Sequence, residues 1–317
     1  MTAPPMRGSW QARTVRQVSA LTARRLAAAA PVNAWTLPLA RTLIDQALRT
    51  VAPALAGTTV EQLRGGGVTG EWVRGPRAGR TDAVVLYVHG GGFVAGSAAG
   101  YRGVASRLST ATRLPVLTLD YRLAPEHPHP AAAQDIEYAF RWLADRGHAP
   151  GRIIVAGDSA GGFLAADFAI TRAGTGLTAP GGVVLFSPMA DLSLGVATGY
   201  EGARACGLLS AGLSRRAVTH FTADPYELLP ADGEPLPPAL IHAGDTEFFG
   251  GDAVALARRW RATGAVCDLQ VWPDQIHAFP VLPVLIPESR LAYRSAARFV
   301  AALLDTTAAA VRSERFS

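Results

Sequence analysis

The feature that most constrains the fold of this chain is a series of short apolar runs that alternate with helical stretches from residue 71 onward. Each run is almost continuously apolar, as expected of a strand buried on both faces of a sheet. The runs occupy residues 83–89, 115–120, 152–156, 182–187, 239–243 and 268–272, and helical apolar spacing separates them at 131–146, 160–173 and 252–263. This alternation predicts an α/β fold with a mostly parallel central sheet and helices on both faces.

Two segments break the alternation. Residues 10–64 show helical apolar spacing and no strand pattern, and residues 189–238 are too long and too mixed for one crossover helix between two strands. Because open α/β sheets bind ligands at the carboxyl ends of their strands, we expect both segments to pack there as a helical cap. The predicted organisation is an N-terminal cap segment at 1–70, a core at 71–188 and 239–317, and an inserted cap segment at 189–238.

The pentapeptide Gly157-Asp-Ser-Ala-Gly161 follows one predicted strand and opens a helical stretch. It matches the Gly-x-Ser-x-Gly nucleophile elbow of the α/β-hydrolase fold, in which small residues permit a tight turn that presents the serine hydroxyl. A tight turn with a helix-capping serine would give the same five residues. In this strand-to-helix context, we predict Ser159 as a nucleophile.

A glycine loop, His89-Gly-Gly-Gly-Phe93, ends an earlier predicted strand. Without side chains, Gly91 and Gly92 can turn their backbone amides toward a developing oxyanion, and the Ala160 amide at the helix start would add a third donor. A merely flexible glycine loop is the alternative. The loop lacks the Lys-Ser or Lys-Thr ending of a phosphate-binding loop, so it does not predict a nucleotide site.

In this fold a carboxylate and a histidine follow the serine in chain order. His277 lies just after the last predicted strand, where a loop can carry its imidazole back over Ser159. For the acid, Asp245 and Glu247 both follow the strand at 239–243, and one of them should orient the imidazole. Asp252 opens the next helix, where we expect it to serve as a helix N-terminal charge.

Three motifs found in chain order extend this interpretation: His-Gly-Gly-Gly at 89–92, Asp-Tyr-Arg-Leu-Ala-Pro-Glu-His-Pro at 120–128 and Gly-Asp-Ser-Ala-Gly-Gly at 157–162. From about residue 84 to its C-terminus the chain resembles the hormone-sensitive-lipase-like family of bacterial esterases. The resemblance implies an α/β-hydrolase fold with a helical cap, and it implies that Asp158 and Glu126 brace the site without reacting.

The resemblance also bears on the acid. In that family the acid belongs to an Asp-Pro-Leu motif at a characteristic distance before the catalytic histidine, and Glu247-Phe-Phe stands at that distance before His277. This spacing favours Glu247. The Asp-Pro-Leu motif itself is missing, so Asp245 stays open as the alternative.

Together these residues predict a serine carboxylic-ester hydrolase that acts through an acyl-enzyme on short- to medium-chain esters, with no metal and no organic cofactor. A deacetylase or an acyltransferase of a secondary metabolite is the alternative, because the same triad serves any acyl-enzyme. A non-catalytic binding protein on this fold would be expected to have a broken triad or glycine loop, whereas this sequence keeps both.

The remaining expectations concern partners and location. The 30 basic residues are all arginine, exceed the 25 acidic ones by five and are spread along the chain, so we expect a small-molecule ester as partner and no nucleic acid. The apolar residues 26–40 are broken by two prolines, so we expect an amphipathic helix and no stable membrane insertion. Cys206 and Cys267 lie in no metal-ligand spacing, as in a reduced cytoplasmic protein. The last strand, 268–272, would be an exposed edge through which a homodimer can form.

Overall fold

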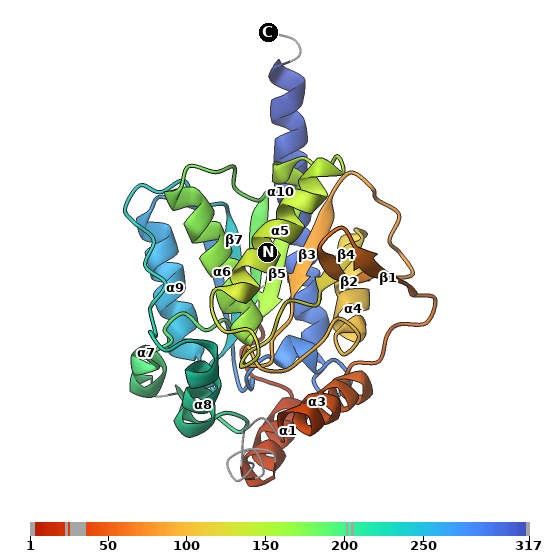
Figure 1. The fold of residues 1–317 in the computed structure, drawn as a ribbon. Helices are drawn as coiled ribbons and strands as arrows, with labels where there is room; N and C mark the ends of the chain where they lie inside the picture. Colours follow the sequence, from red (N-terminus) through yellow and green to blue (C-terminus); the bar gives the residue numbers. More distant parts are fainter. Residues whose placement is uncertain (1–3, 23–24, 26–35, 201, 204–205, 315–317) are drawn as a thin grey trace.

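The computed structural model describes residues 4–22, 25, 36–200, 202–203 and 206–314, and its centre is an eight-stranded sheet in the order β1-β2-β4-β3-β5-β6-β7-β8 (Figure 1). Strand β2 pairs antiparallel with β1 and β4, and all other neighbours are parallel. The strands are β1 (Thr59–Gly65), β2 (Val68–Arg74), β3 (Val84–Val88), β4 (Val116–Leu119), β5 (Ile153–Asp158), β6 (Gly182–Phe186), β7 (Ala239–Gly244) and β8 (Cys267–Trp272). The mostly parallel sheet and the six predicted strands are confirmed.

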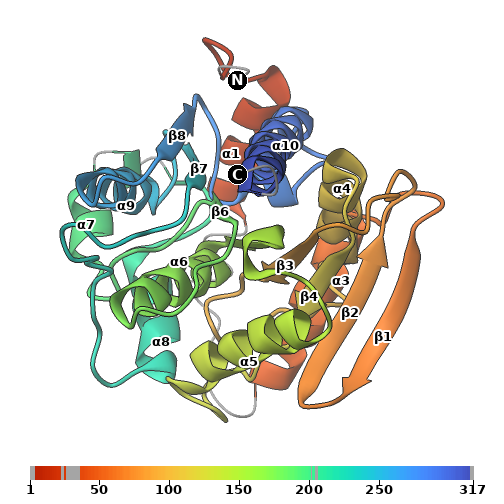
Figure 2. The ribbon, with the colours of Figure 1, turned by 90° about the horizontal axis from the view of Figure 1, so that it is seen from above.

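Helices cover both faces of this sheet, as Figure 2 shows from above. One face carries α4 (Arg102–Thr112) and α10 (Glu288–Glu314), and the other carries α5 (Ala131–Asp145), α6 (Ser159–Gly174) and α9 (Gly250–Ala262). Successive residues of β3 alternate between the two apolar clusters: Leu86 packs with α5 and α6, and Tyr87 packs with α4 and α10. Burial on both faces explains the continuous apolar runs, because each fully buried large apolar side chain contributes roughly 1.5–3 kcal/mol.

The expectation of helix without strand up to residue 64 was wrong, because residues 59–65 form β1, an antiparallel partner of β2. This strand lies at the edge of the sheet and most of its residues are exposed, so it has no apolar face to reveal it. The two residues between the strands, Gly66 and Gly67, both have positive φ, as a tight two-residue hairpin requires. The glycine pair was the available signal. The last residues of the 1–70 segment therefore belong to the sheet.

Four helices gather at the end of the molecule where the parallel strands finish (Figure 1). They are α1 (Trp10–Leu21) and α3 (Leu37–Val51) from the N-terminal segment, and α7 (Gly195–Gly199) and α8 (Ala211–Phe221) from the insertion. The two segments touch closely, because a Cβ atom on Gly207 would overlap the carbonyl oxygen of Arg16 in α1. Residues 26–35, most of the predicted amphipathic helix at 26–40, lie outside the described residues.

Two short 3-10 helices are formed by Pro150–Arg152 and Phe279–Val281. Among the helices within the described ranges, none is long and apolar enough to cross a membrane.

Candidate active site

Ser159 stands at the sharp turn between β5 and α6, with its backbone in the left-handed region at φ +53°. The strand and helix approach too closely there for side chains. A Cβ atom on Gly157 would lie 2.5 Å from the carbonyl oxygen of Gly161, and one on Gly161 would overlap the carbonyl oxygen of Val88. The flanking glycines thus permit the turn, and a non-glycine residue at positive φ is the strained conformation that a nucleophile elbow imposes.

The structure brings Ser159, His277 and Glu247 into one hydrogen-bonded line. The Ser159 Oγ atom lies 2.8 Å from His277 Nε2, and His277 Nδ1 lies 3.1 Å from Glu247 Oε2. The second carboxylate oxygen of Glu247 accepts the Gly244 N–H at 3.0 Å. Because the carboxylate accepts from Nδ1, Nε2 is left as the acceptor for the serine hydroxyl. This is the arrangement that a general base requires.

Asp245, the alternative acid, has no such contact. Its backbone N–H donates to the Trp272 carbonyl at 3.0 Å, and its own carbonyl accepts from the Tyr200 hydroxyl at 3.3 Å. Burial raises the pKa of the Asp245 carboxyl. Of the two candidates, the structure places only Glu247 against the imidazole of His277.

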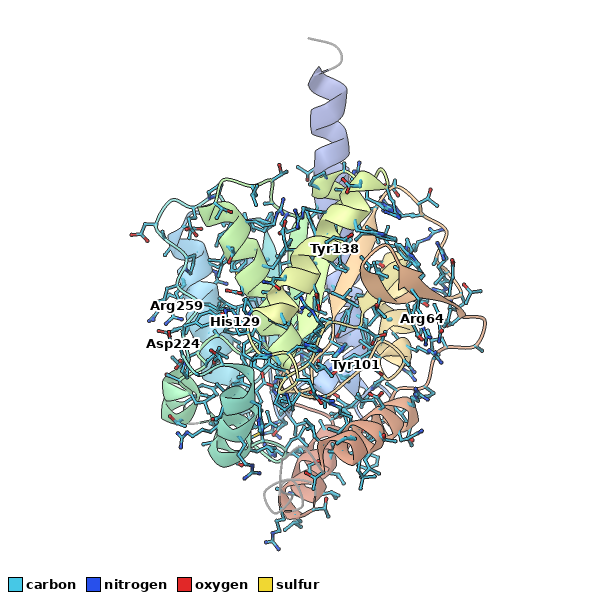
Figure 3. The ribbon with its side chains drawn as sticks, viewed as in Figure 1. Arg64, Tyr101, His129, Tyr138, Asp224 and Arg259 are labelled. Carbon is cyan, nitrogen blue, oxygen red and sulfur yellow. The ribbon has the colours of Figure 1, made fainter. Side chains whose placement is uncertain are left out.

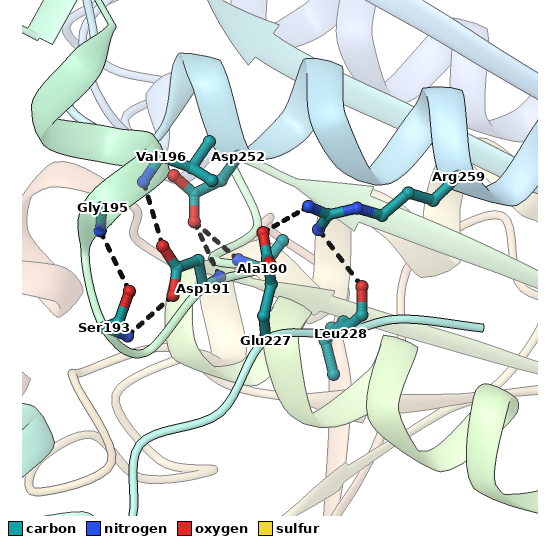
Figure 4. Close-up of polar contacts among 9 residues, drawn as sticks. All are labelled: Ala190, Asp191, Ser193, Gly195, Val196, Glu227, Leu228, Asp252 and Arg259. Carbon is teal, nitrogen blue, oxygen red and sulfur yellow. Dashed lines mark hydrogen bonds and ion pairs between the residues drawn. The ribbon is translucent and has the colours of Figure 1, made fainter. Parts of the chain in front are cut away.

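Asp252 lies in the first turn of α9, as expected, but it is fully buried. Figure 4 shows its contacts with Ala190 and Asp191. The Asp252 Oδ1 atom accepts the N–H groups of Ala190 at 2.8 Å and Asp191 at 3.0 Å. Burial raises the pKa of Asp252 to about 7. The Asp191 carboxylate in turn accepts the Val196 N–H at 3.0 Å. Asp252 therefore fastens the start of the inserted segment to α9 and does not reach the triad.

The glycine loop lies beside Ser159 in a tight turn. Gly91 has φ +121° and Gly92 has φ +64°, values that favour glycine. The Gly91 carbonyl accepts the N–H of Ala95 at 3.1 Å. In the hydrogen bonds of the described residues, neither the Gly91 nor the Gly92 amide donates to a protein acceptor. Ala160 lies in the first turn of α6, where amides have no intrahelical acceptor. None of the three amides is therefore committed to an acceptor in the hydrogen bonds of the described residues.

Asp158 joins the glycine loop to the nucleophile turn. Its carboxylate accepts from the Tyr87 hydroxyl at 2.9 Å, the Gly90 N–H at 3.0 Å and the Tyr101 hydroxyl at 2.9 Å (Tyr101 is labelled in Figure 3). Burial raises the pKa of Asp158 to about 6, although the hydrogen bonds from these three donors act to lower it. The bracing that the family resemblance implied for Asp158 has this geometric basis. The two tyrosines gave no sequence signal, because each reads as ordinary core.

The inserted helix α8 packs directly on the glycine loop. The rings of Phe93 and Phe221 stack with centroids 3.9 Å apart, and His129 (labelled in Figure 3) meets Phe221 edge-on at 5.5 Å. A Cβ atom on Gly92 would lie 3.2 Å from the Cβ of Ala217 in α8. Helix α8 therefore limits the space beside Gly92.

Within the part of the chain that the structure describes, no group of three His, Cys, Asp or Glu side chains is placed to hold a metal ion. Cys206 and Cys267 are both buried, and neither forms a disulfide.

Comparison with known proteins shows that this chain is similar to esterases. Residues 85–281 match the family model described as alpha/beta hydrolase fold. A carboxylesterase/phospholipase, LipF of Mycobacterium tuberculosis, is 33% identical over 88% of this chain and 79% of its own length. An acetyl-hydrolase of Streptomyces hygroscopicus is 39% identical over 74% of this chain and 80% of its own.

Two solved structures are similar over nearly their whole length. The esterase EstE5, soaked with p-nitrophenyl butyrate, has a TM-score of 0.84 and 30% identity, and the match covers 93% of this chain and 99% of that one. An esterase from the bacterial hormone-sensitive lipase family has a TM-score of 0.83 and 32% identity, with 93% and 98% covered.

Proposed function

The chain belongs to the α/β-hydrolase fold family, as a hormone-sensitive-lipase-like esterase, and from this membership we propose how it cleaves carboxylic esters. The protein is a serine carboxylic-ester hydrolase. We assign Ser159 as nucleophile, His277 as general base and Glu247 as the acid that orients it. The line of hydrogen bonds from Ser159 Oγ through His277 to Glu247 carries this proposal.

In the first half of the reaction, Ser159 Oγ attacks the ester carbonyl carbon while its proton passes to His277 Nε2. Glu247 holds the Nδ1–H tautomer and stabilises the imidazolium. The carbonyl π electrons move to oxygen, and the amides of Gly91, Gly92 and Ala160 stabilise that oxyanion. Collapse breaks the bond to the alcohol oxygen, which takes the proton from His277 and leaves an acyl-enzyme.

In the second half, water attacks the acyl-enzyme carbonyl and gives a proton to His277. Collapse of the second oxyanion breaks the bond to Ser159 Oγ, which recovers its proton from His277. Removing one oxyanion donor typically costs about a hundred- to a thousandfold in kcat. We propose short to medium acyl chains as substrates, because the Phe93–Phe221 stack and Ala217 occupy space beside the glycine loop. The alternative is deacetylation or acyl transfer with the same triad. The names of the relatives do not favour this alternative over ester hydrolysis.

Hydrolysis of p-nitrophenyl esters from acetate to laurate by the wild type and Ser159→Ala tests this function. We expect turnover of the shorter esters by the wild type and none above background by Ser159→Ala. Ser193→Ala is a matched control, since its hydroxyl is on an exposed residue of the inserted segment and accepts the Gly195 N–H. A folded wild type that turns over no ester, or a Ser159→Ala variant with normal turnover, contradicts the proposal.

We also propose a cytoplasmic homodimer that does not bind nucleic acid. The location rests on two buried cysteines that form no disulfide with each other. The dimer rests on β8, which ends the sheet and leaves Val271 38% exposed. The absence of nucleic-acid binding is proposed because many arginines pair with carboxylates of the same chain, including Arg102 with Glu71 and Arg172 with Glu137. The cap organisation at 1–70 and 189–238 remains a proposal, with the sheet beginning at Thr59.

A further inference from the structure

Arg41, in the N-terminal helix α3, makes four hydrogen bonds to the rest of the molecule near the active site. Its Nε donates to the Val94 carbonyl at 2.7 Å, and one terminal nitrogen donates to the Ala124 carbonyl at 2.9 Å. The two terminal nitrogens also grip both carboxylate oxygens of Glu126, at 2.9 and 2.7 Å. An exposed ion pair of this kind contributes little to stability by itself. The bonds to the two backbone carbonyls need a separate explanation.

The Val94 carbonyl connects Arg41 to Gly92 through two peptide groups. The Val94 carbonyl and the Ala95 N–H belong to one planar trans peptide, so they point in opposite directions. The Ala95 N–H donates to the Gly91 carbonyl at 3.1 Å, and that carbonyl shares its peptide plane with the Gly92 N–H. The chain of donors therefore runs from the guanidinium through the peptide groups 94–95 and 91–92 and ends at the Gly92 amide.

The Gly91 amide is fixed in a parallel way by His89. The His89 Nδ1 atom donates to the Gly90 carbonyl at 2.8 Å, and that carbonyl shares its peptide plane with the Gly91 N–H. This second support lies wholly within the core, because the His89 ring is buried and stacks on Tyr121 at 4.4 Å. Among the described residues, the Gly92 amide is thus linked to a side chain of α3, whereas the Gly91 amide is linked to His89 of the core.

We propose that Arg41 is a positioning residue for the oxyanion hole: it orients and polarises the Gly92 amide through the two intervening peptide groups. Hydrogen-bonded chains polarise one another in a low-dielectric interior, and a cation at the far end makes the last N–H a better donor to an anion. The stabilisation grows as negative charge develops, so it acts on the transition state more than on the bound ester. The inference rests on the proposed function, because it takes Gly92 as an oxyanion donor.

The test compares Arg41→Met with the wild type on p-nitrophenyl acetate, with kcat normalised to the active sites titrated in the burst. We expect kcat to fall by about tenfold to a hundredfold with KM nearly unchanged, less than the loss from deleting a direct donor. Binding of a trifluoromethyl ketone, which forms an oxyanion on Ser159, should weaken by the same factor as kcat. Arg49→Met, at the exposed last turn of α3, is the matched control and should behave as wild type.

Two further variants keep the test decisive if Arg41→Met folds poorly. Arg41→Lys retains a cation that can reach one carbonyl and should lose less than Arg41→Met. Arg41→Ala should regain part of its kcat in guanidinium chloride at concentrations below those that unfold it. Unchanged kcat in the Arg41 variants, or a fall in kcat without weaker trifluoromethyl ketone binding, overturns the inference. Failure of the proposed function looks different, because Ser159→Ala would then retain full esterase activity.

Discussion

At the scale of single residues, the burial of Glu247 determines how the triad responds to substitution. Its carboxylate is fully buried, and one oxygen accepts the Gly244 N–H while the other accepts from His277 Nδ1. An amide in this position can turn its NH₂ toward His277 and so favour the tautomer that cannot accept the serine proton. The shape of the site would be preserved while its chemistry is lost.

We therefore expect Glu247→Gln to lower kcat on p-nitrophenyl esters by about 10⁴-fold, as loss of the orienting acid does in serine hydrolases of this mechanism. Asp245→Asn is the matched control, because it makes the same change two residues away, and it should leave kcat close to the wild-type value. A larger loss at Asp245 than at Glu247 would move the acid to Asp245.

His242 on β7 provides a second prediction. Its ring is fully buried, and neither nitrogen has a hydrogen-bond partner among the described residues. Burial lowers its pKa to about 3, from an unfolded value of about 6.5. The folded protein thus holds His242 neutral, and its contribution to stability is present above pH 6.5 and is lost as the pH falls toward 3.

Replacement of His242 with leucine should flatten this dependence. In urea unfolding between pH 7 and pH 4, the wild type should lose up to about 1.4 kcal/mol per pH unit through this group, and His242→Leu should lose correspondingly less. The exposed His127→Gln variant serves as control. Equal pH slopes for the wild type and His242→Leu would show that the group does not govern acid stability.

The residues that sequence could locate are those with a local pattern at a strand end. Ser159 lies in the Gly-x-Ser-x-Gly motif and the glycines at 90–92 in the His-Gly-Gly-Gly motif, and His277 follows the last strand. Arg41, Tyr87 and Tyr101 could not be found in this way. Each makes its contact with a residue far away in the chain, such as Val94 for Arg41 or Asp158 for the tyrosines. No spacing within a helix or strand encodes such a contact.

At the scale of elements, the close crossing of β3, β5 and α6 makes the nucleophile turn intolerant of added atoms. The backbone of Gly161 faces the Val88 carbonyl, which cannot move without disturbing the sheet. We expect Gly161→Ala to lower stability by roughly 1–3 kcal/mol and to reduce kcat, because the serine turn must shift.

Gly212→Ala is the matched control for this element, since a Cβ atom there meets nothing within 4 Å and the residue is in helix α8. It should leave stability unchanged or raise it by about 0.5–1 kcal/mol. Chemical denaturation of the two variants measures the difference. A Gly161→Ala variant as stable and active as Gly212→Ala would contradict the packing account.

The same scale shows which elements sequence could predict. Strands buried on both faces can be predicted from their continuous apolar runs, as for β3 and β5. An edge strand such as β1 has no buried face, so its residues follow no apolar period and their pairing depends on the Gly66-Gly67 turn. The residues of β1 are mostly polar and show no strand period, so the helical prediction for the preceding residues extends through them.

At the scale of the whole molecule, the N-terminal segment contacts the active site from two sides. Helix α3 reaches the glycine loop through Arg41. The segment at α1 reaches the loop that carries His277, where Asp274 accepts the Gly8 N–H at 3.2 Å and pairs with Arg16 at 3.4 Å. The N-terminal segment thus contacts both Val94, directly after the glycine loop, and Asp274, in the loop that carries His277.

Assembly belongs to this scale as well. If two copies join through β8, then Val271→Arg should place a charge at the shared edge and yield monomers in analytical ultracentrifugation. Val284→Arg, at a valine that is 58% exposed outside the sheet, is the control and should keep the wild-type mass. A wild type that sediments as a monomer at micromolar concentration would exclude the β8 dimer.

Trapping the acyl-enzyme tests directly whether Ser159 is the nucleophile. The enzyme is mixed with excess p-nitrophenyl acetate, quenched in acid within the burst, digested and examined by mass spectrometry. We predict one acetyl group on the peptide that contains Ser159, accumulation of that species in His277→Ala only at a much slower rate, and none in Ser159→Ala. An acetyl group on another residue would contradict the assignment of Ser159 as the nucleophile. So would steady ester hydrolysis in which Ser159 stays unmodified and the Ser159→Ala variant keeps its activity.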